Sequence, residues 1–159
     1  MDHRATDDIA PNLFEPSGTE RLLVWATRKY AFRCATALLV DLEFRRVCGE
    51  RLGLAVSTAF QEFLRLLAGY GRRPLALGPP GWRGMTQDEH RLLQLFAAAQ
   101  AEGQDDRLRM HLTWFLPAPA AREARPRVTL VAVALRNHGR RLSLTSNGTA
   151  PITRRNYAP

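Results

Sequence analysis

The sequence predicts an all-α fold, a single small bundle of about four to five helices. Apolar residues recur every three or four positions in several stretches, and sequences typical of helix caps precede these stretches, while Gly and Pro clusters separate them. With 159 residues, 45% of them hydrophobic, the chain can bury one continuous core without disulfides or a structural metal. We expect an N-terminal arm over residues 1–16, one domain over residues 17–145 and a basic tail over residues 146–159.

The first predicted helix covers roughly residues 20–40. Residues 17–20, Ser-Gly-Thr-Glu, have the spacing of a capping box, and an apolar stripe follows from Leu23 to Leu38. Arg28 lies largely off this stripe. The apolar pattern changes phase near Asp41, so we expect either a bend there or two helices, the second ending at Gly53.

Two further helices are predicted near residues 57–69 and 87–102. Thr58 begins a second capping box, and the apolar stripe that follows it ends at Gly69 and Gly71. The segment over residues 72–85 is rich in Pro and Gly and is expected to form a loop. The next helix begins at Thr86, with Asp88 and Glu89 in its first turn, where the helix dipole favours anions.

The last two periodic segments fit either a helix or a strand. Residues 105–116 and residues 128–135 each show helical spacing, but both also fit strands, the first by alternation and the second by its Val/Thr-rich composition. If both were strands, the fold would be α+β with a small C-terminal antiparallel sheet, and residues 137–139 would turn a hairpin.

A string of short motifs bears on this choice. The motifs are Arg72-Arg73-Pro74-Leu75, Asp88-Glu89 with Leu92-Leu93, Ala98-Ala99-Gln100, and His111-Leu112 with Trp114. Over about 45 residues this string resembles a group of small, uncharacterised bacterial proteins that are helical throughout. The resemblance implies helices over residues 105–116 and 127–138, and it implies no activity.

The positive charge of the chain is concentrated in its last third. Residues 1–105 carry 13 basic and 13 acidic side chains, whereas residues 106–159 carry 10 basic and 2 acidic ones, so the net charge of +8 belongs to that segment. Such clustering attracts polyanions or an acidic protein surface. A possible helix-turn-helix over residues 44–67, with its turn at Gly53 and a recognition helix opening at Ser57, also fits nucleic-acid binding.

Patterns of catalytic and metal sites are absent from the sequence. The histidines are dispersed, no Cys-x-x-Cys pair occurs, and neither a GxSxG elbow nor a phosphate-binding glycine motif is present. Capping and dipole effects account for the acidic residues beside His90. We therefore expect no enzymatic activity, no metal and no cofactor. We also expect no membrane span and a cytoplasmic location, because no apolar run approaches about 20 residues.

These observations favour a small regulatory or adaptor protein that binds a protein partner. Trp and Arg dominate the energetics of interfaces, and the candidate contacts are of these two types. They are Arg72, Arg73, Trp82, Arg83, Arg140 and Arg141. In a second interpretation, Trp82 is buried and simply holds the loop against the bundle. The alternative function is nucleic-acid binding through the basic residues 106–159, and a homodimer is compatible with either function.

Overall fold

The computed structural model describes residues 18–32 and 37–143, and within these residues the chain forms six helices and no strand. The helices are α1 (Gly18–Ala31), α2 (Ala37–Cys48), α3 (Glu50–Tyr70), α4 (Gln87–Gln100), α5 (Asp105–Phe115) and α6 (Ala118–Asn137). The predicted all-α fold is thus confirmed. Both ambiguous segments are helical, as α5 and part of α6, and the alternative C-terminal sheet is not supported. The predicted arm and tail lie outside the described residues.

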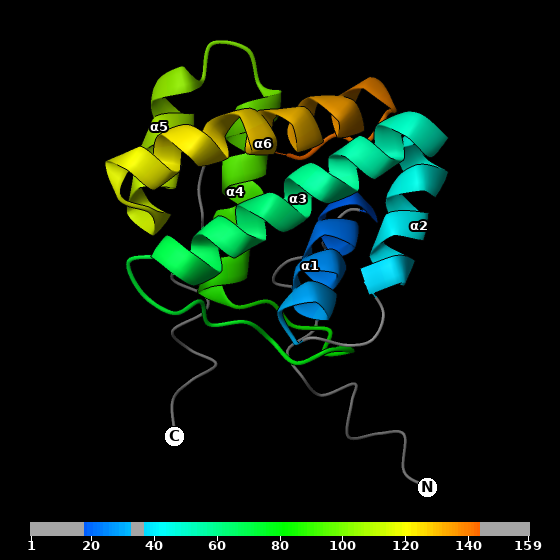
Figure 1. The fold of residues 1–159 in the computed structure, drawn as a ribbon, viewed down its shortest axis with the longest axis horizontal. Helices are drawn as coiled ribbons and strands as arrows, with labels where there is room; N and C mark the ends of the chain where they lie inside the picture. Colours follow the sequence, from blue (N-terminus) through cyan, green and yellow to red (C-terminus); the bar gives the residue numbers. More distant parts are fainter. Residues whose placement is uncertain (1–17, 33–36, 144–159) are drawn as a thin grey trace, which may run out of the picture.

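The helices α3 and α6 cross the molecule side by side, with α4 behind them, α1 and α2 toward one end and α5 toward the other (Figure 1). Aromatic side chains from α2, α3 and α4 meet at the centre. The rings of Phe44 and Phe60 lie 5.5 Å apart, and Phe63 meets Phe96 edge to face at 5.7 Å. Each fully buried ring contributes roughly 1.5–3 kcal/mol. This cluster joins segments that are far apart in the sequence.

The helices in the first half of the chain end and begin at residues other than those predicted. The helix α1 ends at Ala31, and α2 runs through Asp41 without a break. Asp41 faces α3, where it accepts hydrogen bonds from Ser57 and Gln61, so the change of phase reflects a polar contact between two helices. The break comes at Gly49, the single residue between α2 and α3, whose φ of +86° lies in the region that favours glycine.

The predictions of a helix end at Gly53 and a helix start at Thr58 are wrong, because α3 continues through both positions. Gly53 is needed for packing: a Cβ atom there would lie 2.3 Å from the Cα atom of Arg45 on α2. Ser57 is buried in the middle of α3. The proposed helix-turn-helix, with its turn at Gly53 and a recognition helix opening at Ser57, is therefore not present.

The helix α6 begins well before the predicted segment at Val128. Residues 117–127 contain three prolines, of which Pro117 caps the helix and Pro119 lies in its first turn, where no intrahelical N–H bond is needed. Pro126 is accommodated inside α6. Arg122, Arg125 and Arg127 therefore lie on a helix. Gly139, just beyond the helix end, has a φ of +74°, which favours glycine. None of the helices in the described residues combines the length and apolarity that crossing a membrane requires.

Candidate functional site

A buried ion pair organises the loop between α3 and α4. Arg28 of α1 donates two hydrogen bonds of 2.8 Å to the two carboxylate oxygens of Glu89, and it also donates to the carbonyl oxygens of Trp82 and Gly84. Arg28 is only 5% exposed, although it lies largely off the apolar stripe of its helix. A guanidinium can be buried in this way because its charge is paired and its donors have acceptors.

Glu89 is held in place by both the loop and its own helix. Its carboxylate accepts hydrogen bonds from the backbone N–H groups of Gly78 and Thr86, and Thr86 caps the helix in return by accepting from the N–H of Glu89. Burial alone raises the pKa of the Glu89 carboxyl. The hydrogen bonds from Arg28, Thr86 and Gly78 and the charge of Arg28 outweigh burial and leave that pKa below its ordinary value.

Trp82 belongs to the same structural unit. Its ring centre lies 5.5 Å from the guanidinium carbon of Arg28. The loop accommodates the ring with glycines, since a Cβ atom at Gly78 or Gly84 would lie 2.4 Å or 2.1 Å from ring atoms of Trp82. This geometry favours the interpretation in which Trp82 anchors the loop. Its predicted neighbour Arg83 is exposed beside it.

Arg72 and Arg73 lie where the chain leaves α3 and passes the end of α5. The backbone N–H of Arg72 donates to the carbonyl of Phe115, and its side-chain Nε donates to the carbonyl of Thr113 at 2.8 Å. The guanidinium carbon of Arg73 lies 3.8 Å from the ring centre of Trp114, and that of Arg91 lies 4.1 Å from the same ring centre. Sequence reasoning missed Arg91 and Trp114 as site residues.

The surroundings of Trp114 carry a positive field. His111, one turn earlier on α5, is buried, and its pKa is lowered by burial and by the nearby charges of Arg91 and Arg107. Asp88 supplies a carboxylate beside these arginines, with one oxygen 3.5 Å from the guanidinium of Arg73. The arrangement is therefore suited to an anion.

Arg140 and Arg141 follow the end of α6, away from the loop. The side chain of Gln100 donates to the carbonyl of Arg140 at 2.8 Å and accepts from the N–H of Leu142 at 2.7 Å. These bonds fasten the segment to the end of α4. Arg140 is half-buried and Arg141 is exposed. The six predicted contacts thus lie in three places: at Trp114, at the Trp82 junction and beside Gln100.

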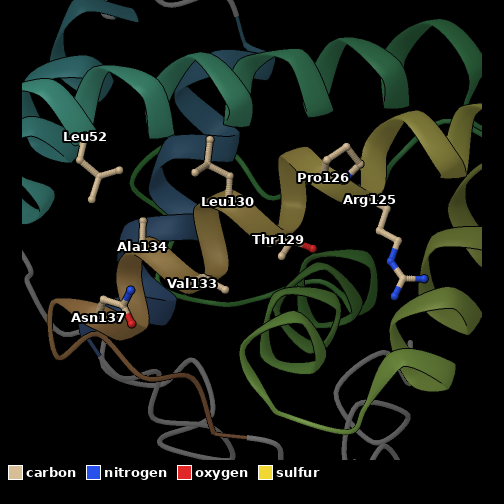
Figure 2. A pocket seen from close by; sticks show the side chains of 8 residues that line it. All are labelled: Leu52, Arg125, Pro126, Thr129, Leu130, Val133, Ala134 and Asn137. Carbon is tan, nitrogen blue, oxygen red and sulfur yellow. The ribbon is translucent and has the colours of Figure 1, made fainter.

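The outer face of α6 carries a groove that the sequence analysis did not identify (Figure 2). It is a shallow, open hollow of about 560 Å³. Its lining consists of Arg125, Pro126, Thr129, Leu130, Val133, Ala134 and Asn137 of α6, with Leu52 of α3. In Figure 2, Leu52 reaches toward this face from the neighbouring helix. Among the α6 residues from Pro126 onward, Pro126, Leu130 and Val133 are apolar, at least partly exposed and spaced by three or four positions, so α6 presents a second apolar stripe beside the one that faces the core.

A second set of exposed apolar side chains lies on α2 and the end of α1. Leu38 is 65% exposed, and Leu39, Leu42 and Phe32 are each close to half exposed. These residues flank residues 33–36, which the structure does not describe.

Among the described residues, no group of three or more His, Cys, Asp or Glu side chains is placed to hold a metal ion. Comparisons of the chain with protein-family models, with curated proteins and with solved structures found no match.

Proposed function

We propose that this chain is a small, non-enzymatic regulatory or adaptor protein that binds a protein partner in the groove of α6. The observation that carries the proposal is the second apolar stripe of that helix. Leu130 is 39% exposed and lies between Pro126 and Val133 in the lining of the groove. A helix that already buries one face in the core gains nothing from a second apolar face unless another surface covers it.

The occupant that fits this groove is an amphipathic helix with acidic residues along its edge. From Pro126 to Asn137 the stripe extends over about 17 Å, at about 1.5 Å per residue, which matches three turns of a partner helix. Arg125 lies at the groove, where it pairs with the exposed Asp105 at 2.9 Å, and none of the described residues that line the groove carries a carboxylate. The whole of α6 has four arginines and one glutamate. An acidic partner is therefore complementary in charge.

A capture experiment with matched variants tests the proposal. The full chain is immobilised as wild type, as Leu130→Glu and as Leu54→Glu, and proteins retained from the source cells after nuclease treatment are quantified by mass spectrometry. Leu54 is 45% exposed on α3 and does not line the groove, so it controls for a new charge at an exposed leucine. We expect a stoichiometric protein that wild type and Leu54→Glu retain and Leu130→Glu loses.

Other results would contradict this groove as the site. Loss with Leu54→Glu but not with Leu130→Glu would place the partner on another face. Recovery that depends on nucleic acid would favour the alternative function, which relies on the basic residues 106–159. Light scattering that shows a wild-type dimer and a Leu130→Glu monomer would make the occupant a second copy of the chain.

A further inference from the structure

We infer that Arg73 and Arg91, which contact the ring of Trp114, form together with the neighbouring Arg72 a second binding site that takes an acidic segment of a protein. These three residues are called the arginine cluster below. They come from the loop after α3 and from the first half of α4, whereas the groove lies between α6 and the start of α3. The inference therefore rests on different residues from those of the proposed function.

The first argument is the charge that remains unpaired. Of the three guanidinium groups only that of Arg73 lies near a carboxylate, that of Asp88 at 3.5 Å, and Asp88 also accepts a hydrogen bond from the backbone of Ala76. Within the described residues, neither Arg72 nor Arg91 has a carboxylate within 4.0 Å. Like charges held close together repel each other, and a bound anion relieves this repulsion.

The second argument is that the cluster is already ordered. Arg72 donates a hydrogen bond to the carbonyl of Thr113, and the guanidiniums of Arg73 and Arg91 each lie over the ring of Trp114. Ordering long side chains on binding costs free energy, and here much of that cost is met in the free protein. A stacked guanidinium still presents N–H groups at its edge, in the fork geometry that matches a carboxylate.

The third argument separates an acidic protein segment from nucleic acid. Single-stranded nucleic acid is held by bases stacked on exposed aromatic rings and by a continuous basic track for the phosphates. The ring of Trp114 is contacted by two guanidiniums and by the ring of Phe115, which lies nearly perpendicular to it at a centre-to-centre distance of 4.9 Å. Asp88 interrupts the positive charge within the cluster. A short run of carboxylates fits this site better than a phosphate backbone does.

A peptide-binding titration tests the inference. Fluorescence anisotropy of a fluorescein-labelled oligoglutamate peptide is measured against the full chain at low salt. The variant Arg73→Gln/Arg91→Gln should weaken binding about tenfold, since two charge-assisted contacts are lost. The control Arg21→Gln/Arg51→Gln removes the same charge from exposed arginines on α1 and α3 and should stay within about twofold of wild type. Equal losses in both double variants would overturn the site.

Two further measurements keep the test decisive. Binding to wild type should weaken steeply as salt is raised, and absence of binding at low salt would overturn the inference even if the double variant proved unstable. Tighter binding of a labelled single-stranded oligonucleotide that the same double variant abolishes would assign the cluster to nucleic acid instead. Leu130→Glu should bind the peptide as wild type does, so failure of the groove proposal and failure of this one remain distinguishable.

Discussion

Glu89 combines two structural roles in one carboxylate. It completes the capping box at the start of α4, and it neutralises Arg28, which reaches it from α1. The hydrogen bond from Gly78 ties the intervening loop to the same group. Three separate segments therefore depend on one side chain, whose removal would leave the charge of Arg28 buried and without its partner.

We expect Glu89→Gln to destabilise the protein by about 3 kcal/mol or more, because breaking one partner of a buried ion pair leaves the other uncompensated. Urea denaturation at pH 7 measures this loss. The control is Glu43→Gln, which removes the partner of Arg46 from a solvent-exposed pair and should leave the denaturation midpoint nearly unchanged. Equal stability of wild type and Glu89→Gln would show that the pair contributes nothing.

His111 makes the stability of the fold depend on pH. Its pKa in the folded chain lies below the ordinary value of 6.5, because burial and the charges of Arg91 and Arg107 disfavour the protonated form. Around and below pH 6.5 the unfolded chain binds more protons at this histidine than the folded chain does, so the free energy of unfolding falls as the pH is lowered through this range.

We expect His111→Gln to lose less stability between pH 7.5 and pH 5.5 than wild type does, as measured by urea denaturation. His90, whose pKa is lowered mainly by burial, keeps part of the dependence in the variant. An identical loss in both proteins would contradict the role of His111.

At the scale of the element, α3 contains two glycines that differ in the space around them. Gly53 lies against the backbone of α2, whereas a Cβ atom at Gly69 would meet nothing within 4 Å. We expect Gly53→Ala to destabilise the fold by about 1–3 kcal/mol, because α2 must move away from α3. Gly69→Ala should be neutral or should stabilise α3 by about 0.5–1 kcal/mol. Thermal unfolding of the two variants checks the difference. Equal effects would mean that α2 and α3 do not pack as closely as described.

The same glycines show how far the sequence predicts the elements. The start of α4 was predictable, because Thr86 and Glu89 signal a cap locally. The boundary between α2 and α3 was not predictable, since either Gly49 or Gly53 could end a helix. Only tertiary structure decides that Gly49 takes a positive φ while Gly53 makes room for Arg45. Pro126 is another such position, because α6 accommodates a residue that usually ends a helix.

At the scale of the whole molecule, the candidate sites are assembled by packing and not by motifs. Arg72 and Arg73 were selected from the sequence, but Arg91 and Trp114 join them from α4 and α5, and no local pattern links these positions. The groove depends on a helix that begins ten residues before the segment predicted from Val128. Trp82 was selected for its residue type, yet its surroundings favour a structural role. Residue type thus indicated which side chains could make contacts, and the tertiary structure determined which residues lie beside them.

Gln100 connects the two ends of the described fold. Its side chain bonds to the backbone of Arg140 and Leu142, and the next residue, Ser143, donates to Glu20 near the start of α1. We expect Gln100→Ala to cost about 1–3 kcal/mol, because a buried N–H and a carbonyl lose their partner. Hydrogen exchange should show faster exchange at the amide of Leu142. Unchanged exchange there would mean that other contacts hold this segment.

The ion pair of Arg28 and Glu89 also affects the rates of folding and unfolding. It joins residues 61 positions apart, whereas α2 and α3 are separated by one glycine and can pair as a local hairpin. Contacts that close long loops tend to form after local ones, because the chain entropy must be lost first. Attachment of α1 should then follow the rate-limiting step of folding. In stopped-flow measurements, Glu89→Gln would unfold faster than wild type while refolding at nearly the same rate. The lifetime of the folded state, more than the speed of reaching it, would depend on this one pair.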